Sequence, residues 1–123
     1  AGIGIYCEER ECFVTANHIC TTSHTEETIL PRFVYFYQLY PEESSLSITV
    51  TIRLQIKTTE NADIILVPDK EQYEQYTKRK TYQFIKEYAN TKEVEDIIAL
   101  EKGYGLIIVP TKESQLSIYI EYL

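Results

Sequence analysis

Three cysteines and two histidines lie within one short segment near the start of the chain, and they are the residues best able to do chemistry. They are Cys7, Cys12, His18, Cys20 and His24. Thiolates and imidazoles are the usual ligands of Zn²⁺, which takes four of them in a closed structural site. His18 and Cys20 are two positions apart, so on a strand they share a face. A metal site built from Cys7, Cys12, His18 and Cys20 is therefore one interpretation of this segment.

A disulfide is the competing interpretation of the same cysteines. Their spacing, C-x4-C followed by x5-H-x-C, is not that of a standard zinc knuckle. Cys7 and Cys12 flank a charged turn and can face one another on a hairpin, while a pair of Cys20 with either of them stays open. We favour a disulfide, which a location outside the cell would stabilise. One thiol is then left over, and neither a metal nor another cofactor is expected.

No other part of the sequence carries a catalytic signature. There is no Gly-x-Ser-x-Gly elbow, and the four glycines are too scattered to form a phosphate-binding loop. Adjacent acids such as Glu8 and Glu9, or Glu42 and Glu43, point apart on a strand and suit a solvated surface. The sequence therefore indicates a protein that is not an enzyme.

The elements that position these residues are strands, and the clearest of them covers residues 46–57. Strand side chains alternate between two faces, and here one face is wholly aliphatic and the other wholly polar. The aliphatic residues are Leu46, Ile48, Val50, Ile52, Leu54 and Ile56. Such a strand needs neighbours on both edges and a second layer over its apolar face. The pattern predicts an all-β protein, a two-layer antiparallel β-sandwich of jelly-roll or Ig-like type.

The rest of the chain predicts one sandwich domain over residues 1–123, with roughly eight or nine strands. Residues 29–40 are apolar on both faces, which favours a central strand over an exposed aromatic patch. Residues 21–28 are polar and predict a loop. Pro68 followed by acidic residues predicts one short helix near 69–78. The other predicted strands cover residues 1–7, 12–20, 63–67, 81–89, 92–101, 106–109 and 115–123.

The composition of the chain limits the classes of partner that the protein can bind. The chain has 123 residues and a net charge of −7, from 19 acidic and 12 basic residues. A nucleic-acid binder needs a basic face, so this balance argues against one. No apolar run approaches the roughly 20 residues of a membrane span. A chain rich in Ile, Tyr, Glu and Lys, without Met, is compatible with a thermophile.

Over about the last 70 residues the order of features resembles extracellular β-sandwich domains of the pre-peptidase C-terminal type. The stretches that carry the resemblance are the Val-Pro-Asp corner at 62–69, the Glu-x-Tyr-x-x-Tyr insertion at 71–76, the Gly-Tyr-x-Leu strand at 103–109 and the alternating strand at 116–122. The resemblance ends before Leu46. It implies a secreted or cell-surface sandwich that binds or assembles, usually without catalysis.

These observations lead to the hypothesis that the protein is a structural or interaction module outside the cell. It would associate with other protein chains, above all with copies of itself. Its alternating N-terminal segment, residues 1–7 with Ile3, Ile5 and Tyr6, can complete the sheet of another subunit by strand addition. A head-to-tail contact of this kind gives a filament. The receiving or lateral surface would be the aromatic strand with Phe33, Tyr35 and Tyr37.

The alternative hypothesis is a metal-binding or redox protein built on Cys7, Cys12, His18, Cys20 and His24. Intracellular disulfides occur in thermophiles, so the compartment does not separate the two hypotheses.

Overall fold

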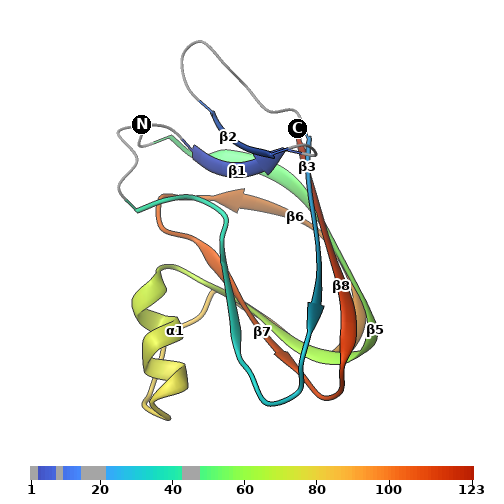
Figure 1. Ribbon diagram of the computed structural model, residues 1–123. Helices are drawn as coiled ribbons and strands as arrows, with labels where there is room; N and C mark the ends of the chain where they lie inside the picture. Colours follow the sequence, from blue (N-terminus) through green and yellow to red (C-terminus); the bar gives the residue numbers. More distant parts are fainter. Residues whose placement is uncertain (1–2, 8–9, 15–21, 43–47) are drawn as a thin grey trace.

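The computed structural model (Figure 1) describes residues 3–7, 10–14, 22–42 and 48–123, with the backbone alone described at 3–7, 10–14, 22–23 and 122. This part of the chain is all-β with one short helix, as predicted, and its paired strands run antiparallel. The elements are β1 (Ile3–Cys7), β2 (Arg10–Val14), β3 (Thr22–Ile29), β4 (Tyr35–Gln38), β5 (Val50–Val67), α1 (Lys70–Thr77), β6 (Lys86–Leu100), β7 (Gly105–Pro110) and β8 (Ser114–Tyr122).

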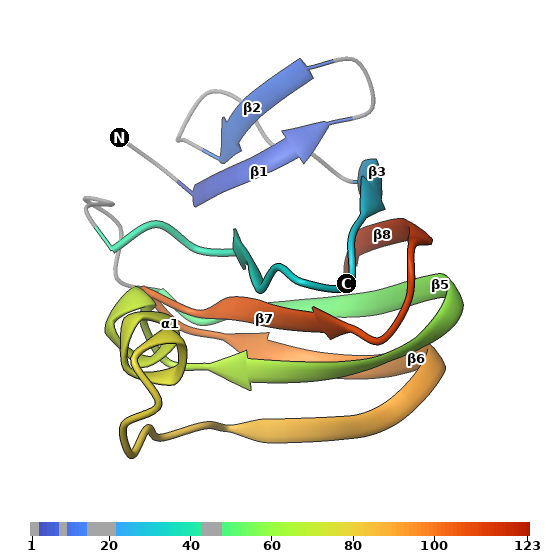
Figure 2. The ribbon, with the colours of Figure 1, turned by 60° about the horizontal axis from the view of Figure 1, so that its bottom comes forward.

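One long strand, β5, organises the main sheet. β1 and β2 form a two-stranded sheet, and the other strands form a six-stranded sheet in the order β3-β8-β5-β7-β4, with β6 beside β5. The first half of β5 pairs with β8 and the second half with β7, while β6 follows β5 along its other edge. Figure 2 shows β5 and β6 bending together, so that the sheet curls. The curl brings the two halves of β5 onto opposite sides of one core.

The bend in β5 falls at its polar residues 58–61, where its register with β6 shifts between Lys57 and Ala62. Two backbone amides at the bend, those of Thr59 and Glu60, donate to the Ser114 hydroxyl at 3.0 and 3.1 Å. Because backbone amides need an acceptor, this one hydroxyl gives both of them a hydrogen-bond partner where the chain bends.

Alternate residues of β5 form the centre of the core, as the alternation in the sequence predicted. Ile52, Leu54 and Ile56 are fully buried, and Ile64 and Leu66 from beyond the bend belong to the same cluster. A smaller cluster lies on the outer face of the sheet, where aromatic side chains pack over three buried residues: Ile65, Val67 and Ile107.

Helix α1 covers this outer cluster and begins as the sequence predicted. The carboxylate of Asp69 caps the helix by accepting from the backbone N–H of Gln72 at 3.3 Å. Tyr73 and Tyr76 are three positions apart on one face of the helix, and both pack against the outer cluster. The helix is therefore attached to the sheet by tyrosines. No helix in the part of the chain described here is long and apolar enough to cross a membrane.

The prediction of a central strand over residues 29–40 was wrong. β3 ends at Ile29, and β4 is a separate strand at one end of the sheet path, paired with β7 alone. Both of its faces are apolar because Tyr35 and Tyr37 pack on the main core, while Phe36 packs on the cluster beneath α1.

Three other boundaries differ from the prediction. Residues 22–28, predicted as loop, belong to strand β3, because they pair with β8 along their whole length. Residues 58–62, between the predicted strands 46–57 and 63–67, lie inside β5 and include its bend. The strand predicted at 81–89 begins only at Lys86 and continues to Leu100. Ile48, expected on the buried face, lies before β5 and is 54% exposed.

Candidate interaction surface

The predicted cysteine and histidine cluster falls largely on residues whose side chains the structure does not describe. His18 and Cys20 lie outside the described residues, and the backbone register of the β1–β2 hairpin pairs Cys7 with Arg10 and Cys12 with Ile5. His24 lies in β3, with its Nε2 3.0 Å from Ser117 Oγ and 3.3 Å from a Glu26 carboxylate oxygen. The described side chains contain no cluster of three or more metal-binding residues. The disulfide and the metal site both stay predictions.

β3 and β4 follow one another along the chain, stand at opposite ends of the sheet path, and do not pair with each other in the described residues. Tyrosine hydroxyls connect them instead: Tyr35 Oη accepts from the Leu30 backbone N–H at 2.9 Å, and Tyr37 Oη donates to the Glu27 carboxylate. Burial, then the adjacent Glu27 carboxylate, raises the pKa of Tyr37 far above its ordinary value, so the hydroxyl stays protonated. We call this unpaired line, with Glu27, Leu30, Phe33, Tyr35 and Tyr37, the β3–β4 seam.

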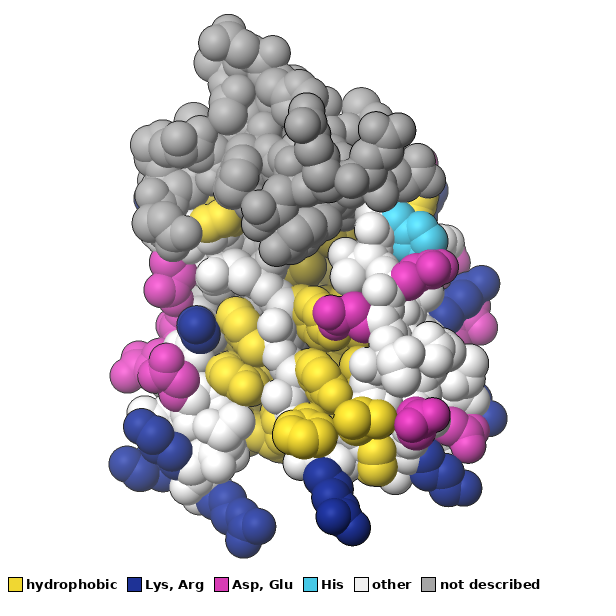
Figure 3. Space-filling view, viewed as in Figure 1, with side chains coloured by type: hydrophobic (Ala, Val, Ile, Leu, Met, Phe, Trp, Pro, Cys, Tyr) yellow, Lys and Arg dark blue, Asp and Glu magenta, His cyan; other side chains and the backbone are white. Residues whose placement is uncertain are grey.

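Apolar side chains are exposed along the β3–β4 seam. Leu30 is 39% exposed and Phe33 57% exposed, and the Phe33 ring lies 6.5 Å from that of Tyr35. Figure 3 shows apolar side chains gathered between β3 and β4, with charged side chains placed around them. Contiguous exposed apolar surface of this kind commonly marks an interaction site.

In the part of the chain that the structure describes, three strands of the main sheet have an edge without a strand partner, and these edges differ in charge. β6 carries charged side chains along most of its length, and β3 carries two exposed glutamates, Glu26 and Glu27. Charge on an edge strand discourages pairing with another chain. β4, with the sequence Tyr-Phe-Tyr-Gln, has no charged residue at all. Among the described edges it is the one best suited to accept a further strand.

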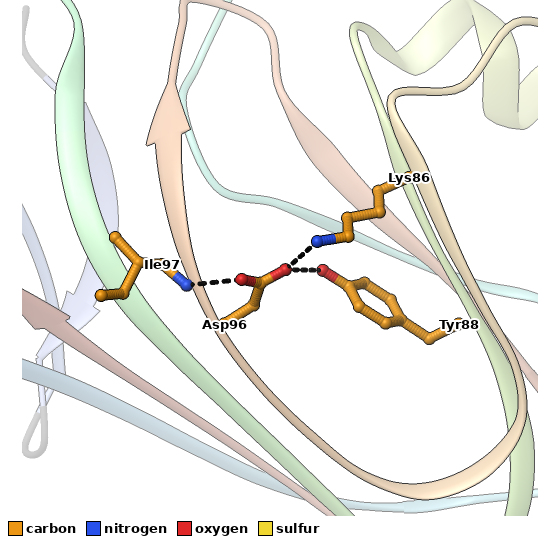
Figure 4. Close-up of polar contacts among 4 residues, drawn as sticks. All are labelled: Lys86, Tyr88, Asp96 and Ile97. Atoms are coloured by element: carbon orange, nitrogen blue, oxygen red, sulfur yellow. Dashed lines mark hydrogen bonds and ion pairs between the residues drawn. The ribbon is translucent and has the colours of Figure 1, made fainter.

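Side chains of β6 also bind one another across the bend of this strand. As Figure 4 shows, Lys86 and Tyr88 from the start of the strand both reach Asp96 across its bend. Tyr88 Oη donates to Asp96 at 2.7 Å, Lys86 forms an ion pair with the same oxygen, and the Ile97 N–H donates to the other oxygen at 2.9 Å. Hydrogen bonds from Lys86 and Tyr88 lower the pKa of Asp96. These contacts fix the bend of β6 and leave its edge unsuited to a partner strand.

A groove of about 750 Å³ opens next to the seam, between α1 and the turn that precedes β4. Its cations are Arg32 from the turn and Arg79 and Lys80 from the end of the helix. The remaining lining residues are mainly aromatic, and together they are Phe33, Val34, Tyr73, Tyr76, Thr77 and Tyr82. We call it the α1 groove.

The walls of the α1 groove are held by contacts between aromatic rings. The Tyr73 ring lies 5.2 Å from that of Phe36, its hydroxyl donates to the Val34 carbonyl at 3.2 Å, and the Tyr76 and Tyr82 rings are 5.2 Å apart. Burial raises the pKa of both Tyr76 and Tyr82, with smaller effects from Asp63 and Glu87. The walls are therefore neutral, and the positive charge comes from the rim.

Sequence analysis found part of this surface and missed the rest. It singled out Phe33, Tyr35 and Tyr37, which the structure brings together in the seam, whereas the side chains of Ile3, Ile5 and Tyr6 are not described. It missed the α1 groove, because residues 78–80 look like a solvated charged turn and nothing local brings Arg32 to them. The spacing of Tyr73 and Tyr76 was the one available signal.

No protein-family model and no curated protein matches this chain. Among solved structures, it is similar to the crystal structure of Yersinia pseudotuberculosis-derived mitogen (YPM), with a TM-score of 0.50 and 11% identity over 81% of this chain and 84% of that one. Similarity at so low an identity concerns the fold alone, and the resemblance to pre-peptidase C-terminal domains stays a prediction. What the comparison shows is an all-β architecture shared with that mitogen.

Proposed function

We propose that this protein is a non-catalytic structural or interaction module of the cell surface or extracellular space, and that it assembles with copies of itself by strand addition at the β3–β4 seam. In this proposal the curled sheet is a two-layer sandwich of jelly-roll type, whose layers meet along β5 and β6 and remain unpaired at the seam. The observation that carries the proposal is the β4 edge, which is uncharged, aromatic and without a strand partner on that side among the described residues.

The backbone of β4 has hydrogen-bonding groups to offer a partner. Leu39, directly after β4, donates its backbone N–H to the Tyr104 carbonyl at 2.9 Å, on the side that faces β7. In the register of β4 with β7, Leu39 continues the pairing opposite Tyr104, and successive residues of a strand direct their amides to alternate sides. We therefore expect the amides of Phe36 and Gln38 to be directed away from β7 and toward the seam. An added strand would pair with these groups and place its apolar side chains against Tyr35 and Tyr37.

The N-terminal segment of a second copy is suited to be the strand that is added at the seam. In the described backbone β1 pairs only with β2, outside the six-stranded sheet. A two-stranded sheet is by itself of marginal stability, so a place for β1 in a larger sheet would favour the exchange. Ile3 and Ile5 alternate as a donor strand requires, and a donor at one end with an acceptor along the seam gives a head-to-tail polymer.

A matched pair of substitutions tests the surface. Phe33 at the seam and Ile97 on β6 are both 57% exposed. We expect Phe33→Asp to reduce assembly at least tenfold, measured as polymer mass by light scattering and electron microscopy, because it puts a charge into the apolar contact. Ile97→Asp introduces the same charge on the clamped β6 edge and should leave assembly unchanged. Equal loss in both variants would show that net charge, not the seam, controls association.

A further inference from the structure

We propose that the α1 groove binds an acidic peptide segment of a partner protein, with a carboxylate at the cations and an aromatic or aliphatic side chain between the tyrosines. This goes beyond strand addition, which recognises backbone, because the groove would recognise side-chain chemistry.

The cations of the groove are available to a ligand. In the part of the chain that the structure describes, Arg53 pairs with Glu121 and Lys86 with Asp96, whereas Arg32, Arg79 and Lys80 form no ion pair. The chain has 19 acidic residues against 12 basic ones, so acids are in excess. Three cations that share one groove and have no acidic partner there are complementary to a ligand with more than one carboxylate.

The aromatic walls of the α1 groove favour a ligand that has an apolar side chain as well as a negative charge. Phe33 is 57% exposed, and Tyr73, Tyr76 and Tyr82 present partly exposed rings beside the cations. Guanidinium groups next to aromatic faces suit a ligand in which a carboxylate and an apolar side chain are neighbours. An extended acidic peptide with one aromatic residue offers both groups at that spacing.

The backbone of Arg79 gives an independent observation. Lys80 N donates to Gln75 O and Arg79 N to Tyr76 O, which is the Schellman pattern that ends a helix. Arg79 occupies the position with positive φ, 58°, that glycine ordinarily fills. Among the described residues the other non-glycine residue with positive φ is an asparagine, Asn90, which tolerates it. Arginine is unfavourable for the turn itself, and an unfavourable residue on the rim of a groove points to a role for its side chain.

A peptide fits this groove better than a nucleic acid does. Nucleic-acid binding needs many phosphate contacts along a basic face, whereas this chain carries a net charge of −7 and gathers three cations at one groove. A long polyanion would meet repulsion from the rest of the surface, but a short acidic segment would not.

Calorimetric titration of the full chain with synthetic peptides tests the proposal. We expect acetyl-Glu-Glu-Tyr-Glu-Glu-amide to bind at least tenfold tighter than its Gln-Gln-Tyr-Gln-Gln and Glu-Glu-Gly-Glu-Glu counterparts, and to weaken as salt is added. Absence of binding, equal binding of the three peptides, or tighter binding of a five-nucleotide oligothymidylate would each overturn it.

Arg79→Gly separates ligand binding from folding. Glycine suits the positive φ, so the melting temperature should stay the same or rise, while peptide affinity falls about tenfold with the loss of a charged contact. Lys112→Gly, in the exposed turn between β7 and β8, is the control and should bind as the parent does. Unchanged affinity in Arg79→Gly contradicts the proposal. Arg79→Gly is expected to assemble as the parent protein does. The experiment therefore distinguishes failure of the peptide-binding proposal from failure of the assembly proposal.

Discussion

Removal of residues 1–6 is expected to convert assembled protein into a folded monomer. The deletion takes away Ile3, Ile5 and Tyr6 and leaves the six-stranded sheet, which makes no backbone pairing with β1. Polymer mass should fall by more than tenfold, measured by light scattering, while the far-ultraviolet circular dichroism of the sheet is retained.

Adding back the missing segment provides the control for this deletion. A synthetic peptide with the sequence of residues 1–6 should bind the truncated protein at the seam, and a version with aspartate in place of both isoleucines should not, because it has no apolar face to lay on Tyr35 and Tyr37. A truncated protein that unfolds would show that the segment belongs to its own fold, and one that still polymerises would show that another surface does the assembly.

Ser114→Ala is expected to lower the stability of the fold more than a single hydrogen bond would suggest. Ser114 is 2% exposed, and its hydroxyl accepts from two backbone amides at the bend of β5. Alanine removes the acceptor of two part-buried amides, and at about 1 kcal/mol for each hydrogen bond we expect a cost of about 2 kcal/mol. For a chain of this size that lowers the melting temperature by roughly 10 °C.

Ser117→Ala on the same strand is the matched control for this effect. Ser117 Oγ contacts the side chain of His24 at 3.0 Å in a partly exposed position, where water can replace the lost partner. Its effect on the free energy of unfolding should stay below about 1 kcal/mol. Equal effects of the two substitutions would mean that the bend does not depend on the Ser114 hydroxyl.

The parts of the fold that the sequence predicted are those that depend on local pattern. Alternation identified the buried face of β5 from Val50 to Ile56, and Pro68 followed by Asp69 located the start of α1. The continuity of β5 through residues 58–61 was not predictable, because polar residues there look like a turn. Their acceptor, Ser114, lies more than 50 positions further along the chain.

In the candidate site, too, only the features that depend on local pattern could be predicted from the sequence. A strand that is apolar on both faces suggests a central place in a sheet, and the pattern cannot tell a neighbouring strand from a covering helix. In β4 the second apolar face is explained by Tyr73, on a helix far away in sequence. Arg32 and Arg79 likewise line one groove only because α1 folds back over the sheet. Periodicity found the aromatic residues, and only tertiary packing could show that they lie at an edge.

Hydrogen–deuterium exchange at β4 tests most directly whether the β3–β4 seam accepts a strand. The comparison is between the assembled full chain and the monomer that lacks residues 1–6, read at the amides of Phe36 and Gln38. Strand addition predicts that both amides exchange at least tenfold more slowly in the assembly, while exchange along the β6 edge is unchanged. Equal exchange at Phe36 and Gln38 in the two samples, with new protection along β6, would contradict the account.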